Sequence, residues 1–301
     1  MLVVGELRDK KMIHTMKDEL QGMGVFAEVR HIEKEDIYFL TVETAEDLPK
    51  AQDYFRVKMG FRKPIEVDQE WVKIKELPRG PVTYAITIGC AVLYVITAYT
   101  EMGKHLQSVL FMGSPETGFL YEVSHGQLWR LITPIFVHLS ILHILFNMLW
   151  FKDLGYLIEN RFGKNNLFAL IGISGVISNL FQYCVSGPEF GGMSGVLYGM
   201  LGFVWVYKKI HHDFEYALPA RDITIMVGWL LLCLTGFLGP IANAAHAGGL
   251  FVGMLFAIYK APEKWGHLHT KYFSLAFLFL AFTIGIEGLK LGGRYFLLLW
   301  L

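Results

Sequence analysis

Two short stretches of this sequence combine small residues with a side chain that can do chemistry. Ser194 stands between glycines in the run Gly191-Gly192-Met193-Ser194-Gly195, where a polar loop becomes an apolar segment. His246 lies in the run Asn243-Ala244-Ala245-His246-Ala247-Gly248-Gly249, which opens another apolar segment about fifty residues later. A hydroxyl and an imidazole inside segments of hydrocarbon length are costly unless the protein uses them. Together they suggest a serine nucleophile and its histidine base.

A polar stripe in a third apolar segment could complete such a site. Ser140, His143 and Asn147 follow one another at spacings of three and four residues, on one face of an expected helix. In isolation, a stripe of this kind could equally hold two helices together. Beside a serine nucleophile, His143 and Asn147 become donors to the oxyanion of acyl transfer, together with the backbone N–H of Ser194. We expect His138 on a different face, bonded to the first external loop.

Tyr198 lies one helical turn after Ser194 and on the same face. Its ring is expected to pack beside the imidazole of His246 and to limit the rotation of that imidazole. A conventional triad would place a carboxylate there. The apolar segments that carry the serine, the histidine and the polar stripe contain no Asp or Glu, so we expect two-residue Ser–His machinery.

Glycines near these side chains support the same hypothesis, although small residues in apolar helices usually mark close packing. Gly195 and Gly249 would let two helices approach until a hydroxyl and an imidazole can form a hydrogen bond. Gly192 would let the loop backbone come close to a substrate carbonyl. Close helix packing and a catalytic pair are therefore compatible explanations of these small residues.

The composition is that of a membrane protein. The chain has 301 residues, of which 53% are hydrophobic and 18% charged, and its mean hydropathy is +0.40. About thirty of its 27 basic and 27 acidic residues precede position 80. This partition predicts a soluble N-terminal domain followed by an all-α polytopic membrane bundle. A net charge of zero without a basic run gives no support for nucleic acid as a partner.

The N-terminal part has the pattern of a small α+β domain. Apolar stripes and β-branched runs in residues 1–60 predict the order βαββα, with both helices on one face of a small sheet. Residues 61–80 are charged and read as a linker. Seven apolar segments long enough to cross a bilayer follow, near 82–99, 131–151, 166–185, 192–207, 222–238, 243–259 and 272–289.

The short loops between these segments predict the orientation. Loops 152–164, 208–221 and 260–271 carry Lys and Arg, whereas loops 186–191 and 239–242 carry neither. By the positive-inside rule, the basic loops and the N-terminal domain are cytoplasmic. Ser194 and His246 then lie at similar depth in the outer leaflet. The external stretch 100–130 is mildly apolar and is expected to lie in the interface.

With these residues assembled, the chain resembles the rhomboid intramembrane serine proteases, most of all the bacterial GlpG type. The resemblance covers about residues 81–260 and rests on Trp129-Arg130, His138 through His143 to Asn147, Glu159-x-Arg161-x-Gly163, Gly191-Gly192-Met193-Ser194-Gly195 and Asn243-x-x-His246-x-x-Gly249. It implies Ser194 as nucleophile, His246 as general base and acid, and His143 and Asn147 as oxyanion donors. Trp129-Arg130 and Glu159-x-Arg161 would be structural.

The resemblance also implies the rest of the biology. It predicts a rhomboid core at 81–260 with six spans, in the inner membrane of a bacterium, with the active site open to the periplasm. Transmembrane protein substrates would be cut in or beside their membrane segments, with small residues just before the scissile bond. Residues 261–301 would be a C-terminal extension, and 272–289 a seventh span that the GlpG type lacks. No metal or other cofactor is expected, and the chain has no HExxH motif.

Two alternatives stay open from the residues. The first is a membrane protein that binds a metal or haem through His138, His143 and His246. The second is a catalytically inactive rhomboid-like protein that binds membrane clients without cutting them. Retention of both Ser194 and His246 argues against the second.

Overall fold

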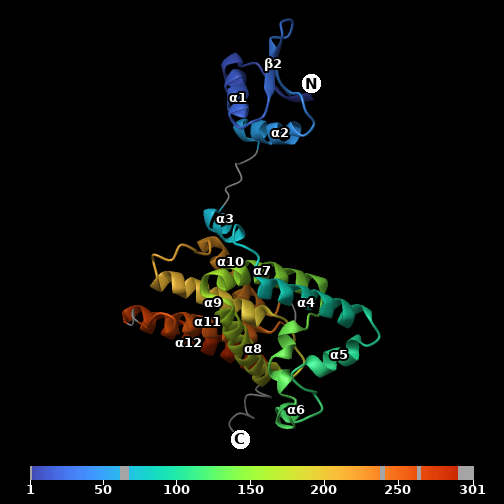
Figure 1. Cartoon of the computed structure of the whole chain (residues 1–301), viewed down its shortest axis with the longest axis vertical. Helices are drawn as coiled ribbons and strands as arrows, with labels where there is room; N and C mark the ends of the chain where they lie inside the picture. The colour runs from blue at the N-terminus through green and yellow to red at the C-terminus, as the bar shows by residue number, and fades with distance from the viewer. Residues whose placement is uncertain (1, 62–67, 238–240, 263–265, 291–301) are drawn as a thin grey trace. The chain divides into compact units, whose positions relative to one another are not determined.

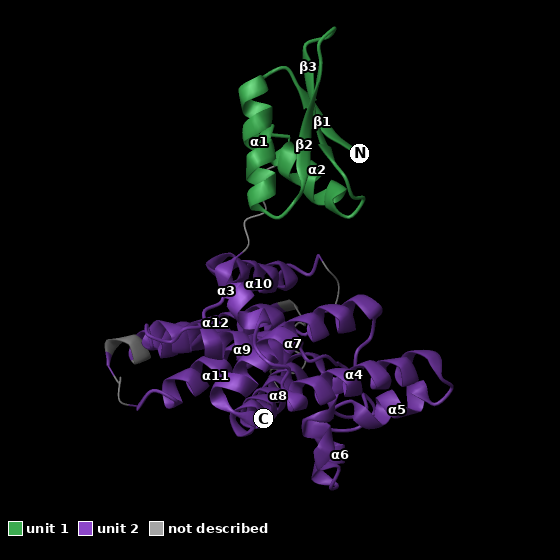
Figure 2. Cartoon of the chain, turned by 45° about the horizontal axis from the view of Figure 1, so that its top comes forward, with its two compact units in different colours: residues 1–67 green, residues 68–301 purple. Residues whose placement is uncertain are grey.

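The computed structural model divides the chain into two compact units, Met1–Val67 and Asp68–Leu301 (Figure 2). The residues that the structure describes are 2–61, 68–237, 241–262 and 266–290. Parts of five expected segments therefore lie outside the described residues: residue 1 of the N-terminal domain, 62–67 of the linker, 238 of the fifth apolar segment, 239–240 of the loop 239–242, and 263–265 and 291–301 of the C-terminal extension.

Unit 1 has the expected order βαββα. Its elements are β1 (Leu2–Leu7), α1 (Lys10–Gly22), β2 (Ala27–Ile32), β3 (Ile37–Val42) and α2 (Asp47–Lys58) (Figure 1). The sheet is antiparallel with β3 in the middle, in the order β1-β3-β2. Leu40 and Val42 of β3 share one buried core with Met16 of α1 and Phe55 of α2. Alternate residues of a strand point to one face, so both helices cover the same face of the sheet.

Side-chain caps fix where the helices of unit 1 begin. The Asp9 carboxylate accepts a hydrogen bond from the backbone N–H of Met12 at 2.9 Å, at the start of α1. Before α2, the Asp47 backbone N–H donates to the Thr44 hydroxyl oxygen at 3.1 Å, and that hydroxyl donates to the Asp47 carboxylate at 2.7 Å. These bonds satisfy donors that the first turn of a helix leaves without intrahelical partners.

Unit 2 is helical in all its described elements. They are α3 (Gln69–Lys75), α4 (Pro81–Tyr99), α5 (Gly103–Leu110), α6 (Tyr121–Ser124), the 3-10 turns η1 (Leu128–Leu131) and η2 (Thr133–Phe136), α7 (Ile141–Phe162), α8 (Lys164–Ser186), α9 (Ser194–Ile210), α10 (Ala220–Leu234), α11 (Asn243–Tyr259) and α12 (His267–Lys290). The expected fold class, a helical membrane bundle after a small α+β domain, is therefore confirmed.

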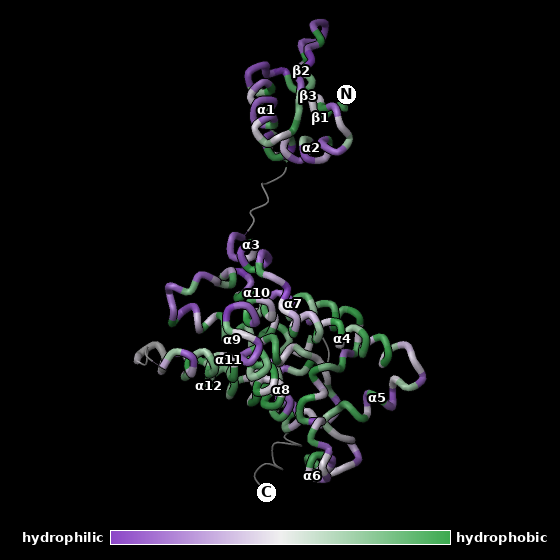
Figure 3. The backbone as a smooth tube through the Cα atoms, viewed as in Figure 1, coloured by the Kyte–Doolittle hydropathy of each residue, from purple (hydrophilic) through white to green (hydrophobic). Residues whose placement is uncertain are grey.

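Four described helices are long and apolar enough to cross a bilayer: α4, α7, α8 and the segment Thr270–Leu289 of α12. The tube in Figure 3 has the hydrophobic colour along much of α4 and α8, and the hydrophilic colour along much of α1 and α3. The sequence predicted seven segments of spanning length, but α9 and α11 have 17 residues each and α10 has 15. At 1.5 Å per residue, such helices reach about 25 Å or less. Their lengths are close to those predicted: α11 has the predicted bounds, α9 is one residue longer than the segment 192–207, and α10 is two residues shorter than the segment 222–238.

The second apolar segment differs most from its expected bounds. The sequence predicted 131–151, whereas the helix α7 begins at Ile141. Residues before it form η1 and η2, and Ser140 has extended backbone with its hydroxyl accepting from the His143 N–H at 3.2 Å. Ser140 is therefore the cap of α7, not a member of a polar stripe. Pro134 lacks the N–H that a continuous helix through this segment would use.

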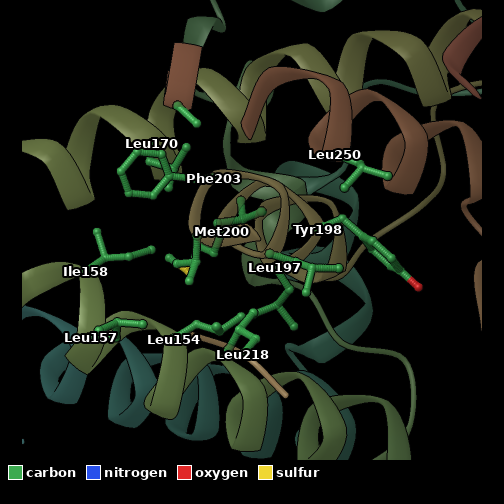
Figure 4. Packing of buried hydrophobic residues seen from close by; sticks show 14 of the residues in the cluster. Leu154, Leu157, Ile158, Leu170, Leu197, Tyr198, Met200, Phe203, Leu218 and Leu250 are labelled. Carbon is green, nitrogen blue, oxygen red and sulfur yellow. The ribbon is translucent and has the colours of Figure 1, made fainter. Parts of the chain in front are cut away.

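Helix α9 is the centre of unit 2, and most of its residues are buried. Figure 4 shows Leu197, Met200 and Phe203 of α9 among apolar side chains of neighbouring helices, including Leu170 of α8 and Leu250 of α11. These residues belong to one buried cluster that also contains residues of α7 and α10. A helix that is apolar all round must be covered on all sides, and this one positions Ser194 at its first residue.

The expected linker is partly helical. Residues Gln69–Lys75 form α3, which belongs to unit 2. The Trp71 indole N–H donates to the Asp222 carboxylate near the start of α10. Arg221 forms an ion pair with Asp68 at 2.5 Å. Asp68 and Trp71, which lie in the expected linker, are therefore partners of the first residues of α10.

Candidate active site

Ser194 is the first residue of α9 and follows a loop that the preceding segment holds in place. The Gly192 N–H donates to the Pro134 carbonyl at 3.0 Å. A Cβ on Gly191 would lie 2.6 Å from the Val137 carbonyl oxygen. Gly192 has a φ of 122°, which L-residues with a side chain rarely adopt. The glycines thus let the loop lie directly against the residues before α7.

The structure brings Ser194 and His246 together. Their Oγ and Nε2 atoms lie 2.7 Å apart, although the residues are 52 positions apart in sequence. His246 is the fourth residue of α11 and is 5% exposed, whereas Ser194 is partly exposed. The other ring nitrogen, Nδ1, is buried and has no hydrogen-bond partner in the described part of the chain. Within the described ranges, the pair therefore has no third residue that orients the imidazole through Nδ1.

Direct backbone packing between α9 and α11 sets this distance. A Cβ on Gly249 would lie 1.8 Å from the Gly195 carbonyl oxygen, and one on Gly253 would lie 1.8 Å from the Gly199 carbonyl oxygen. Any side chain at these positions would push the helices apart. These two glycine contacts between α9 and α11 therefore hold Ser194 and His246, near the starts of the two helices, within hydrogen-bonding distance of each other.

Tyr198 lies against the imidazole, as the sequence predicted. The rings of Tyr198 and His246 have centroids 4.8 Å apart and planes tilted by 31°. The Tyr198 hydroxyl donates to the Met226 carbonyl of α10 at 2.8 Å. The phenol is thus fixed at its far end, and its ring restricts the imidazole from one side.

His143 and Asn147 lie on the first two turns of α7. A Cβ on Gly192 would lie 2.5 Å from Nε2 of His143, so the imidazole is packed against the loop that precedes Ser194. The Asn147 side-chain amide donates to the His143 carbonyl at 2.7 Å. Its Oδ1 is buried and has no partner in the described part of the chain. One of its two amide hydrogens therefore holds α7, and the other is the one that could serve an oxyanion.

His138 does not have the position that the sequence analysis gave it. Its Nδ1 lies 3.1 Å from the Phe136 carbonyl, and its ring meets the ring of His143 edge to face with centroids 5.1 Å apart. It is 1% exposed. The helical spacing that assigned it to another face does not apply, because α7 begins only at Ile141. His138 is thus a neighbour of the site.

One contributor was missed from the sequence. The Gln182 side chain of α8 accepts a hydrogen bond from the backbone N–H of Ala245 at 3.1 Å. Ala245 directly precedes His246, so Gln182 holds the first turn of α11. A lone Gln in an apolar segment was the available signal, since buried amides need partners.

The remaining motif residues organise the surroundings. Arg130 donates to the carbonyls of Ser108 and Phe111 at 2.7 and 2.8 Å, which ties α5 to η1. The Glu159 carboxylate of α7 accepts from the backbone N–H groups of Val82 and Thr83, both at 2.9 Å. It therefore caps the first turn of α4 from a neighbouring helix.

The buried histidines do not converge on a common point. Among the described residues, no three His, Cys, Asp or Glu side chains are arranged as a group that could hold a metal ion. The His246 Nε2 atom instead faces the Ser194 hydroxyl. The chemistry that this arrangement supports is nucleophilic attack by serine with histidine as proton acceptor.

A partly exposed serine hydroxyl and a buried imidazole, held together between apolar helices, define a class of helical protein with a Ser–His pair inside its bundle. Comparison with known proteins shows a family likeness: residues 125–263 match the model of the rhomboid domain. This part of the chain is therefore similar to the rhomboids, and four described helices are long and apolar enough to cross a membrane.

Two relatives illustrate the similarity. The chain is 34% identical over 186 residues to "Rhomboid protease GlpG" of Yersinia pseudotuberculosis, an alignment that covers 62% of this chain and 64% of the relative. It is 35% identical over 179 residues to "Rhomboid protease GlpG" of Salmonella paratyphi A, covering 59% and 62%. The chain thus matches slightly less than two thirds of the length of these relatives.

Proposed function

We propose that this protein is an intramembrane serine endopeptidase that uses Ser194 and His246. The observation that carries the proposal is the 2.7 Å contact between Ser194 Oγ and His246 Nε2 inside an apolar bundle. The similarity to two proteins named rhomboid protease supports it. Packing alone would bring the two helices together through glycines, but it would not need a hydroxyl and an imidazole at the point of contact.

The proposed reaction begins with attack of Ser194 Oγ on a peptide carbonyl carbon while its proton passes to His246 Nε2. The resulting oxyanion accepts hydrogen bonds from the Ser194 N–H, His143 and Asn147. Ser194 is at the start of a helix, where backbone N–H groups lack intrahelical acceptors and the helix dipole favours negative charge. Each donor of this kind is worth roughly 3 kcal/mol in acyl transfer.

The remaining steps return the enzyme to its starting state. The C–N bond breaks as His246 gives its proton to the leaving amine, which leaves an ester on Ser194. Water then attacks the ester carbonyl and gives its proton to His246. The C–O bond to Ser194 breaks, the carboxylic product leaves, and the proton returns to Oγ.

We infer that substrates are transmembrane or juxtamembrane segments of other membrane proteins. A helical segment hides its carbonyls in hydrogen bonds, so it must unwind locally before Ser194 can attack. Substrates with Gly, Ala, Ser or Pro near the cut are therefore favoured.

We further propose that the N-terminal unit lies in the cytoplasm and that the site lies on the periplasmic side of the inner membrane. Basic residues within 152–164 and 208–221, at the ends of α7 and α9 and in the connections that follow, support this orientation. Ser194 and His246 are the first and fourth residues of their helices, so both would lie within about one turn of the same surface.

Probe labelling of the purified protein tests the chemistry. A fluorophosphonate should label wild-type protein, whereas Ser194→Ala and His246→Ala should lose labelling and cleavage of a reconstituted transmembrane substrate by about a thousandfold or more. Ser124→Ala and His105→Ala replace exposed residues of the same types and should label as wild type does. Undiminished cleavage by folded Ser194→Ala would end the proposal.

A further inference from the structure

A buried amide ties three helices together one turn before His246. Asn243 is the first residue of α11 and is 2% exposed. Its Nδ2 donates to the Cys233 carbonyl of α10 at 3.2 Å and to Glu287 Oε1 of α12 at 3.0 Å. An amide has two N–H donors. Both are therefore engaged, one by the backbone of α10 and one by a carboxylate from α12.

Glu287 is an unusual residue for its position. It lies near the end of α12 and is 9% exposed. No other residue between 272 and 289 is acidic or basic. An ionisable side chain inside an apolar span is costly, so its retention calls for a use. The catalytic proposal above does not use it, and the rhomboid match ends at residue 263, before α12 begins.

The contact acts on the turn that carries His246. The His246 N–H donates to the Ala242 carbonyl at 3.2 Å, and the Ala245 N–H donates to the Gln182 side chain of α8 at 3.1 Å. Asn243 lies between Ala242 and Ala245 in this turn. The first turn of α11 is thus fixed by side chains from α8 and α12, while Tyr198 restricts the imidazole from α9.

His246 needs this support from neighbouring helices because the hydrogen bonds of its own ring do little to fix the ring's orientation. Its Nδ1 has no hydrogen-bond partner in the described part of the chain, so no side chain orients the ring as the aspartate of a triad does. The position of the helix turn must then set the position of Nε2. A displacement of about 1 Å at a reacting group can cost on the order of a hundredfold in rate.

We propose that Glu287 is a positioning residue for His246. Its carboxylate holds Asn243, Asn243 holds the first turn of α11, and that turn sets the distance from Nε2 to Ser194. Helix α12 is then part of the active machinery through one hydrogen bond. The inference rests on the proposed serine protease function.

Three substitutions on α12 test it in the full-length protein. Glu287→Met keeps the length of the side chain and suits an apolar helix, but it removes the acceptor. Glu287→Gln keeps an oxygen that can accept from Asn243. Leu278→Met changes a residue that is 64% exposed on the same helix. Cleavage of a reconstituted transmembrane substrate gives kcat and KM, measured well below the unfolding temperature of every variant.

We expect Glu287→Met to lower kcat about tenfold with KM changed less than about twofold, because the base and not the binding surface moves. Glu287→Gln should recover to within about threefold of wild type, and Leu278→Met should match it. Asn243→Ala should lower kcat as Glu287→Met does. The double variant Asn243→Ala/Glu287→Met should be no worse than the poorer single variant, because both remove the same link.

The outcomes separate this inference from the function on which it rests. Wild-type kcat in Glu287→Met, or a Glu287→Gln variant as impaired as Glu287→Met, would overturn the positioning role while Ser194-dependent cleavage stands. Additive losses in the double variant would overturn it also. If wild-type protein neither cleaves nor labels at Ser194, the protease proposal fails and the positioning role fails with it.

Discussion

The carbonyl oxygen of Gly195 occupies the place where a side chain on Gly249 would begin. The two backbones are so close that a Cβ at position 249 would lie 1.8 Å from that oxygen. Since Gly195 follows Ser194 directly and Gly249 lies three residues after His246, this contact controls the approach of the Ser194 hydroxyl to the His246 imidazole. Four predictions follow from this and related contacts.

Gly249→Ala should separate α9 from α11. Overpacking of this kind costs about 1–3 kcal/mol in the free energy of unfolding. Because the Ser194–His246 distance should lengthen, we expect cleavage to fall by more than about tenfold. Thermal unfolding and substrate cleavage measure the two effects. Gly172→Ala is the matched control, because a Cβ at Gly172 of α8 meets nothing within 4 Å. Equal activity of the two variants would contradict the packing argument.

Gly192→Ala should remove activity through His143. A Cβ there would lie 2.5 Å from the imidazole Nε2, and the φ of 122° is strained for alanine. Gly163 also has a positive φ, 84°, but its Cβ would meet nothing within 4 Å. Both variants should lose about 1–2 kcal/mol of stability from strain. Only Gly192→Ala should also lower kcat, by about a hundredfold, because an oxyanion donor moves. A matching loss of kcat in Gly163→Ala would show that backbone strain alone is responsible.

Two substitutions of Tyr198 separate the effect of its ring packing against His246 from the effect of its hydrogen bond. Tyr198→Phe keeps the ring against His246 and loses only the 2.8 Å bond to the Met226 carbonyl. We expect a loss of about 1 kcal/mol in stability and a change in kcat below about threefold. Tyr198→Ala should lower kcat by about tenfold or more, because the imidazole gains rotational freedom. Single-turnover cleavage by the two variants is the measurement, and a larger defect in Tyr198→Phe than in Tyr198→Ala would refute the steric role.

Glu122 should make the segment between α5 and α7 sensitive to acid. Burial raises the pKa of this carboxyl, but hydrogen bonds from the Thr117 hydroxyl and the Ser114 N–H, together with the charge of Arg130, outweigh burial and leave the pKa below 4.5. A group whose pKa is lower in the folded state stabilises the fold above its unfolded pKa. That stability is lost as pH falls through the folded pKa.

The comparison of wild type with Glu122→Gln tests this sign. At neutral pH, Glu122→Gln should be less stable by about 1–2 kcal/mol, since bonds to a charged acceptor are replaced by bonds to a neutral one. The difference should shrink as the pH falls below 4.5 and the wild-type carboxyl becomes protonated. Thermal unfolding of both proteins over a series of pH values from neutral to acidic measures it. A difference that is independent of pH would contradict the role of the charge.

Several local features of the fold could be predicted from the sequence because their causes are local. The βαββα order of unit 1 follows from apolar periodicity and from caps such as Asp9. The start of α9 at Ser194 follows from the change from a glycine loop to an apolar run. The prediction of helices failed where the apolar pattern was ambiguous. Residues 131–140 are apolar but contain Pro134 and the capping Ser140, and they form short 3-10 turns before α7.

The contact between Ser194 and His246 was predictable from the sequence, but the residues that support this contact were not. Matching depth on two helices with small residues indicated that Ser194 and His246 meet, since depth follows from position along each helix. His138 was misplaced because helical spacing was applied to a segment that is not helical. Gln182 was missed because its partner, the Ala245 N–H, is 63 residues away.

The sequence alone therefore determined which segments are apolar helices and which side chains could do chemistry, because these depend on residues close to one another in the chain. Only the tertiary structure decided the rotation of each helix about its axis, and with it the partners of each buried polar group. The link from Glu287 to Asn243 is an example: 44 residues separate them, and no local pattern specifies their contact. Packing of α11 against α9 and α12 brings such groups together, because a buried amide or carboxylate must find its partner wherever the fold offers one.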